Sequence, residues 1–274
     1  MELGLFYNLR MANSDNISQQ TIFELYPKLL ELGDQGKLPK HVAIILDGNR
    51  RWARRTFGDN VKAILGHEKG MNRTVEILRK LKELKSIKYI TLYAFSTENW
   101  TRSQEEVNDL MNLFTTAVPR LLLEVKDANG RFVHLGRKDR IPEKLRLALE
   151  KAEEETKNNA GQLICVGIDY GEDDQEIRMI QKALDTLPKG TPITPEIRKK
   201  LLDTYLSDGT EIPPIDLVLR TSGELRMSRL PNSEYAEFYS IPEPLPELSL
   251  DHVVDALIEF TKRDRRFGGR PTEV

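Results

Sequence analysis

Six short apolar runs, separated by longer segments with helical spacing, constrain the fold of this chain. The runs cover residues 42–46, 89–95, 132–136, 163–169, 216–220 and 236–240, and the predicted helices cover 67–85, 103–126, 142–158, 173–187, 195–206 and 250–263. Alternation of this kind is typical of βαβ units. We therefore expect a single α/β domain over residues 38–274, with a mostly parallel six-stranded sheet flanked by helices.

Residues 1–37 are expected to form an N-terminal extension with one amphipathic helix. Within residues 19–33, apolar side chains recur at helical spacing, namely Ile22, Leu25, Tyr26, Leu29 and Leu32. Such a helix either packs on the main body or lies on a membrane surface. We favour packing, because the apolar face is short and the polar face is not rich in Lys or Arg.

Composition excludes several classes of protein. The formal net charge is −2, from 41 basic and 43 acidic side chains, which argues against a nucleic-acid-binding protein. The single cysteine, Cys165, lies in an apolar run and has no partner for an internal disulfide, which fits a reducing compartment. No run approaches the roughly 18 apolar residues that span a bilayer, and no signal-peptide pattern is present. We expect a cytoplasmic protein, and a transient membrane-surface contact stays open.

The first apolar run ends abruptly in Asp47-Gly48-Asn49 and is followed by a basic segment with helical character. A turn from a strand into a helix collects backbone N–H groups at a helix N-terminus, and this arrangement binds anions. Asp47 adds a negative charge at the same place. A divalent cation that bridges Asp47 and a phosphate reconciles the two, so we expect a Mg²⁺–diphosphate site here.

Two other strand ends carry clustered polar groups, where ligands bind in parallel sheets. The first cluster follows the run 89–95 and contains Ser96, Thr97, Glu98, Asn99, Trp100 and Arg102. The second follows the run 216–220, where Arg220, Arg226 and Ser228 can converge on one anion. The alternatives are a tryptophan that covers the core edge and a turn with surface arginines. We favour ligand binding, because an unpaired Arg220 at the end of a buried strand would be costly.

Two further residues have open interpretations. Glu237 lies in an apolar run, and a buried carboxylate needs either an arginine partner or a metal ion, here one shared with Asp47. His67 follows Gly66 at the start of a predicted helix, where it either assists proton transfer or phosphate binding or is structural. No His/Cys cluster has zinc-ligand spacing.

Together these residues resemble the cis-prenyltransferases, the family of undecaprenyl diphosphate synthase with its dehydrodolichyl and short-chain relatives. The motifs HVAIILDGNRRWA, GHEKG, TLYAFSTENWTRS, DLVLRTSGE-x-RMS, YAEFY and RDRRFGG occur in the family's order between about Leu38 and Gly269. The resemblance implies a Mg²⁺-dependent enzyme. An allylic prenyl diphosphate loses diphosphate, isopentenyl diphosphate attacks that carbon, and loss of a proton leaves a cis double bond. It also implies a hydrophobic tunnel for the product and a homodimer.

The resemblance also implies a role for each matching residue. Asp47 and Asn99 are the expected catalytic residues, and Asp47 and Glu237 the expected metal-linked carboxylates. The expected substrate-binding residues are Gly48, Asn49, Arg50, Arg51, Trp52, His67, Ser96, Thr97, Glu98, Trp100, Arg102, Arg220, Arg226 and Ser228. Arg265 and Arg266 resemble a segment that reaches the active site of a partner subunit.

This chain departs from the family pattern at several positions. Ala63, with Lys62 beside it, stands where the family often has arginine, and Asp169 replaces the asparagine of an Asn-Tyr-Gly-Gly motif. After Ser228 the chain reads Arg-Leu-Pro-Asn-Ser and is shorter than usual. We therefore expect a Z-polyprenyl diphosphate of undecaprenyl or dehydrodolichyl type, with two alternatives. One is a short-chain, branching or cyclising synthase, and the other a non-catalytic partner subunit, which the retained Asp47 argues against.

Overall fold

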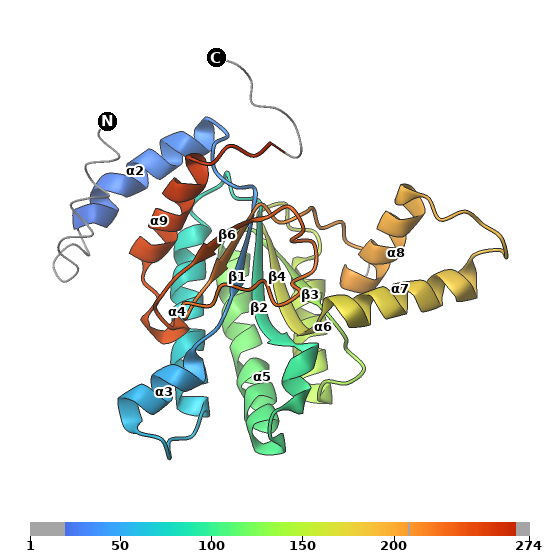
Figure 1. Cartoon of the computed structure of the whole chain (residues 1–274), viewed down its shortest axis with the longest axis horizontal. Helices are drawn as coiled ribbons and strands as arrows, with labels where there is room; N and C mark the ends of the chain where they lie inside the picture. The colour runs from blue at the N-terminus through green and yellow to red at the C-terminus, as the bar shows by residue number, and fades with distance from the viewer. Residues whose placement is uncertain (1–19, 208, 267–274) are drawn as a thin grey trace.

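A six-stranded parallel sheet forms the centre of the computed structural model, which describes residues 20–207 and 209–266 (Figure 1). The strand order is β3-β4-β2-β1-β5-β6. The strands are β1 (His41–Ile45), β2 (Tyr89–Ser96), β3 (Arg131–Leu135), β4 (Leu163–Tyr170), β5 (Leu217–Arg220) and β6 (Glu237–Ser240). Every neighbouring pair is parallel, so the expected sheet is confirmed.

Helices pack mainly on one face of the sheet, and a helix residue, Leu202, reaches the apolar cluster on the other face. The helices are α2 (Gln20–Asp34), α3 (Asn49–Phe57), α4 (Ile64–Leu81), α5 (Gln104–Asp127), α6 (Glu143–Thr156), α7 (Glu172–Thr186), α8 (Pro195–Ser207) and α9 (Leu250–Thr261), with 3₁₀ turns η1 (Thr97–Thr101) and η2 (Leu245–Glu247). The sequence did not predict η1, and it extended α4 to residue 85. The helix stops at Leu81 because the buried Gln162 amide donates to the carbonyls of Leu81, Leu84 and Ile87, which stabilises an irregular turn.

The core lies on both sides of the sheet, as expected for parallel strands. Along β1, Val42 and Ile44 pack into one apolar cluster, whereas Ala43 and Ile45 pack into the other. Helix α2 packs beside α9, and its Leu29 is fully buried in the larger cluster. Packing on the main body is thus the arrangement of the N-terminal helix. Residues 1–19 of the expected extension lie outside the described residues, and the boundary at 37/38 stays a prediction.

Two features of the fold bear on function. Helices α7 and α8 extend away from the sheet in Figure 1. A cavity of about 10 Å³, lined in part by Met71, Phe114 and Leu121, lies in the apolar space between the sheet and α4 and α5. The expected hydrophobic tunnel for the product stays a prediction. Among the described residues, no helix combines the length and apolarity needed to cross a membrane.

Candidate active site

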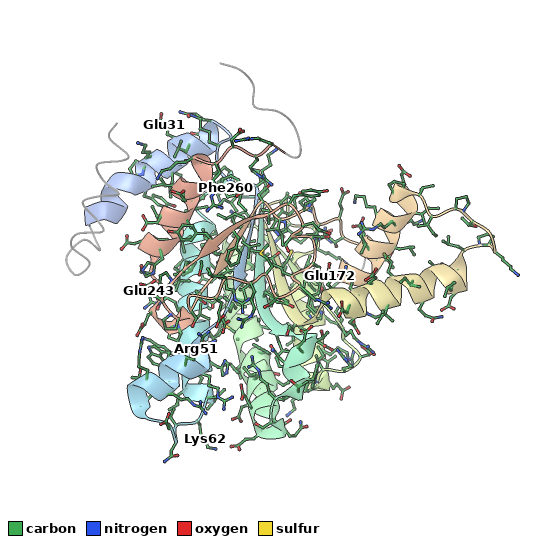
Figure 2. The ribbon with its side chains drawn as sticks, in the orientation of Figure 1. Glu31, Arg51, Lys62, Glu172, Glu243 and Phe260 are labelled. Carbon is green, nitrogen blue, oxygen red and sulfur yellow. The ribbon has the colours of Figure 1, made fainter. Side chains whose placement is uncertain are left out.

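The carboxyl ends of β1, β2 and β5 meet at one edge of the sheet and surround a cavity of about 610 Å³. In Figure 1 this is the lower edge, where α3 follows β1. Eight residues that the sequence selected line the cavity: Asp47, Ser96, Glu98, Asn99, Arg102, Arg220, Arg226 and Ser228. Figure 2 shows Arg51 at the same edge, whereas Glu31 and Phe260 lie near the opposite one.

Asp47 is fixed in the turn that follows β1. Its backbone N–H donates to Thr221 Oγ1 at 2.9 Å, and its own Oδ1 accepts from the Gly48 N–H at 2.7 Å. Gly48 has a φ of 93°, and a Cβ there would lie 2.5 Å from Ser222 Oγ. Only glycine allows the chain to turn so tightly against the loop after β5. The motif thus brings Asp47 beside Arg220, the last residue of β5.

Arg220 is the central cation of the site. Its side chain is buried, and it donates to Asp47 Oδ2 at 2.9 Å and to Ser228 Oγ at 2.6 Å. Burial alone would raise the pKa of Asp47, but the hydrogen bond and charge of Arg220, the Gly48 amide and the charge of Arg51 outweigh it and lower the pKa. Asp47 is therefore an anion at neutral pH. Arg220 Nε is buried and has no hydrogen-bond partner among the described residues.

A second group of cations surrounds Glu106 of α5. Its carboxylate lies 3.0 Å from Arg102 Nη1, 3.6 Å from Arg50 Nη1 and 3.7 Å from His67 Nε2. His67 Nε2 is buried without a hydrogen-bond partner in the part of the chain that the structure describes. Glu106 is not among the residues that the sequence selected for the site. The spacing of Glu106 four residues after Arg102 was the available signal for this pair.

The turn η1 positions the polar cluster after β2. Asn99 Oδ1 accepts from the Ser96 N–H at 3.0 Å, which closes a capping box, and both residues line the cavity. Trp100 does not line it. Its indole N–H donates to Asp169 Oδ1 at 2.8 Å, and its ring packs edge-on against Phe95. Trp100 thus anchors η1 to the core, and its expected substrate contact stays a prediction.

Several other predicted residues surround the cavity without lining it. Arg51 lies 3.5 Å from Asp47 Oδ1 and 2.9 Å from Glu224 Oε1. Asn49 is buried against α4, and the ring N–H of Trp52 donates to Glu247 of η2 at 3.0 Å. Thr97 contacts Gly171. These side chains fix α3 and η1, and only Arg51 of the four reaches Asp47.

Glu237 is not close to Asp47 within one chain. As the first residue of β6 it lies level with Leu217 of β5, which pairs with Val42 of β1. Asp47 comes five residues after Val42, which is roughly 16 Å further along a strand. Glu237 instead accepts a hydrogen bond from Arg263 at 2.9 Å. A metal ion shared by Asp47 and Glu237 of the same chain is therefore wrong, and the ion-pair interpretation of Glu237 holds.

The C-terminal arginines lie at that opposite edge as well. Arg265 donates to Asp216 at 2.6 Å, and Asp216 accepts the backbone N–H groups of Lys40 and His41 at the start of β1. Arg266 pairs with Asp264. Within one chain neither arginine approaches Asp47. The glycines of the RDRRFGG motif lie outside the described residues.

The donor set near Asp47 fits Mg²⁺ only with help from a substrate. Within residues 20–207 and 209–266, no group of three or more His, Cys, Asp or Glu side chains is placed to hold a metal ion. Protein Mg²⁺ sites commonly use one or two carboxylates together with substrate phosphates and waters. The ionised Asp47, beside an Arg220 Nε that has no hydrogen-bond partner among the described residues, fits that pattern.

Comparison with known proteins identifies the family. Residues 45–268 match the family model described as putative undecaprenyl diphosphate synthase. An isoprenyl transferase of Bacillus cereus is 37% identical over 246 residues, which cover 89% of this chain and 93% of that protein. An isoprenyl transferase of Staphylococcus haemolyticus is 35% identical over 271 residues, covering 98% and 100%.

Two solved structures share the fold. The crystal structure of lavandulyl diphosphate synthase from Lavandula x intermedia, in complex with dimethylallyl diphosphate, has a TM-score of 0.76 and 30% identity, and covers 85% of this chain and 99% of its own. A probable undecaprenyl diphosphate synthase from Campylobacter jejuni has a TM-score of 0.64 and 26% identity, covering 84% and 98%. The chain therefore belongs to the undecaprenyl diphosphate synthase family and is a prenyl-transferring enzyme.

Proposed function

We propose that this enzyme condenses isopentenyl diphosphate with an allylic prenyl diphosphate, in a Mg²⁺-dependent reaction, to give a Z-polyprenyl diphosphate. The observation that carries the proposal is the cluster of Asp47, Arg220 and Ser228 at the wall of a 610 Å³ cavity. It combines an ionised carboxylate with a buried guanidinium that keeps a donor free among the described residues. That combination suits a diphosphate and its cation.

Each part of the cavity has a role in this proposal. Arg220, Arg226 and Ser228 bind the diphosphate of isopentenyl diphosphate, since all three line the cavity. Asp47, with the amide of Gly48 and the guanidinium of Arg51 beside it, faces the allylic diphosphate. Mg²⁺ held there would neutralise charge that develops on the departing diphosphate. Asn99 is the group in the wall of the cavity that orients the reacting ends.

A second candidate is a short-chain, branching or cyclising synthase of the same fold. It is favoured by the small size, about 10 Å³, of the apolar cavity between the sheet and α4 and α5. The likeness to a lavandulyl diphosphate synthase points the same way. The two candidates share the diphosphate chemistry and differ in product.

We also propose that the enzyme is a homodimer assembled through helix α7. Three apolar side chains of this projecting helix are exposed in one chain: Ile177 by 66%, Ile180 by 50% and Leu184 by 73%. An apolar strip of this size on an outlying helix is typical of an interface. Replacing Ile177 and Leu184 by glutamate is expected to give a monomer by light scattering, and a variant that remains dimeric would contradict this interface.

The decisive experiment is incubation of purified enzyme with labelled isopentenyl diphosphate and a panel of allylic primers. We expect a ladder of linear products that disappears with EDTA and returns with Mg²⁺. The variant Asp47→Ala is expected to lose at least roughly 1,000-fold in turnover, because both the cation and Arg220 lose their partner. Arg146→Ala on α6, whose exposed pair with Glu150 lies away from the cavity, is the matched control.

Each other outcome has a clear meaning. A single branched or cyclic product would favour the second candidate. If no product forms with any primer, the chain would instead be a non-catalytic partner subunit. Normal turnover of the Asp47→Ala variant would overturn the mechanism. A cytoplasmic location and a transient membrane-surface contact stay predictions, which fractionation of cells and vesicle sedimentation would test.

A further inference from the structure

Each arginine in the cavity wall is already paired with a carboxylate. Arg220 pairs with Asp47, Arg226 with Glu224 and Arg102 with Glu106. The sequence had selected these three arginines. A fourth arginine, Arg229, also lines the cavity and pairs with Asp173, which lines it too. Neither residue of this fourth pair belongs to the residues that the sequence motifs selected.

The backbone directs the side chain of Arg229 toward the cavity at some cost. Ser228 and Arg229 both have φ values of 50°, in the left-handed region that non-glycine residues rarely adopt. Two such residues in succession store backbone strain, and strain of this kind collects at functional sites. Here it lets consecutive side chains line one cavity. Ser228 uses that position to accept from Arg220.

The Arg229–Asp173 pair joins two different parts of the fold across the cavity. Arg229 belongs to the loop between β5 and β6, and Asp173 to the first turn of α7. The two side chains are 62% and 60% exposed, whereas those of Arg220 and Asp47 are 5% and 30% exposed. Exposed ion pairs contribute little net free energy because water solvates both partners. Of the four pairs, this one therefore costs the least free energy to break when a ligand binds the arginine.

A phosphate competes well for an arginine held in this way. A guanidinium binds phosphate oxygens through two parallel hydrogen bonds, which are stronger than a single exposed contact to a carboxylate. Asp173, once released, stays solvated at the N-terminus of α7, where a negative charge is favourable. The exchange thus strengthens the contacts of Arg229 and leaves no buried charge unpaired.

We propose that Arg229 is a phosphate-binding residue of this enzyme, which exchanges Asp173 for an oxygen of a substrate diphosphate. Asp173 then acts as a competitor that occupies Arg229 until the diphosphate arrives. That the natural ligand is a prenyl diphosphate rests on the proposed function. The exchange of Asp173 for a phosphate oxygen rests only on the geometry of the Arg229–Asp173 pair. The shortened segment after Ser228, which departs from the family pattern, thereby gains a role.

The test compares the two partners, because phosphate binding and bracing predict opposite signs for Asp173. Binding of inorganic diphosphate is measured by calorimetry, and KM for isopentenyl diphosphate by turnover. Arg229→Ala is expected to weaken both roughly 10- to 100-fold, and Arg229→Lys less. Asp173→Asn is expected to tighten both by up to about fivefold, because it frees Arg229. Arg146→Ala is the control and should change neither.

The results that would overturn the proposal are equally definite. If Arg229→Ala and Asp173→Asn both weaken binding, the pair is a brace; if neither changes it, Arg229 does not contact the diphosphate. Circular dichroism confirms that the variants fold. An enzyme that incorporates no isopentenyl diphosphate, but binds inorganic diphosphate in an Arg229-dependent way, would refute the proposed function and leave this exchange standing.

Discussion

The buried carboxylate of Asp169 offers the sharpest quantitative prediction. It is fully buried at the end of β4, where its φ of 55° turns the side chain toward η1. Arg140 binds this carboxylate through two hydrogen bonds, from Nε to Oδ2 at 2.8 Å and from Nη2 to Oδ1. The Trp100 ring N–H also donates to Oδ1, and the Arg140 guanidinium lies 5.8 Å from the centroid of the Trp100 ring. Asp169→Asn changes one atom of this network, and both residue types tolerate the left-handed backbone.

The expected magnitude follows from the partners. Asparagine keeps one oxygen for Trp100 but presents an NH₂ group to an arginine N–H, so one charge-assisted hydrogen bond is lost. That loss costs about 1.5–3 kcal/mol. Arg140 is 37% exposed and can turn to water, so nothing further is added. Arg140→Gln is expected to cost more, about 3–5 kcal/mol, because it leaves a fully buried carboxylate without its cation.

Urea unfolding followed by circular dichroism measures both variants and the double variant. We expect Asp169→Asn combined with Arg140→Gln to cost at least about 1 kcal/mol less than the sum of the two single changes. In a Trp52→Phe background Trp100 is the one remaining tryptophan, so its emission reports its position directly. Additive costs, or a cost for Arg140→Gln no larger than for the exposed-pair control Glu150→Gln, would refute the reasoning.

Two further predictions concern pH and product length. Burial lowers the pKa of His41 to about 4, so between pH 6.5 and 4 the unfolded chain binds more protons than the folded one, and the free energy of unfolding decreases by roughly 3 kcal/mol as the pH is lowered through that range. His41→Gln should flatten a urea-unfolding series between these pH values, and an unchanged slope would contradict the reasoning. Phe114→Ala should enlarge the 10 Å³ apolar cavity and lengthen the longest product, at a cost in stability of about 3–5 kcal/mol. Phe114→Leu is the milder variant, and Leu123→Ala is the control, because Leu123 is 70% exposed on the same helix. An unchanged product ladder in both Phe114 variants would mean that this cavity does not limit product length.

The sequence predicted the sheet well because each strand is a short apolar run between helical segments. In β1 the run from Val42 ends at the Asp47 turn, and the structure places the strand at His41–Ile45. The same logic brought Asp47, Asn99 and Arg220 to one edge, since carboxyl ends of parallel strands coincide. These predictions needed only the local sequence pattern and the rules of parallel topology.

The failures share a cause, which is information that only register and backbone angles contain. The sequence shows that Glu237 lies in a strand, but not that it is the first residue of that strand and lies at the wrong edge. Nor does it show that Asp169, read as one more residue of an apolar run, turns through a positive φ toward Trp100. Arg229 was missed for the same reason, because two left-handed residues place it in the cavity.

Paired arginines give the site a physical logic that single residues do not reveal. A cavity with several unpaired guanidinium groups would be unfavourable before substrate binds, because the charges repel and Arg220 is buried. Asp47, Glu224 and Glu106 remove that penalty in the free enzyme. A diphosphate that binds Arg102, Arg226 or Arg229 must then replace a carboxylate, so its affinity is the difference between two contacts. The exposed arginines exchange their carboxylates for phosphate at a low cost in free energy. The buried pair of Arg220 and Asp47 stays intact when the ligand binds, because the ligand can use the Arg220 Nε donor that remains free among the described residues.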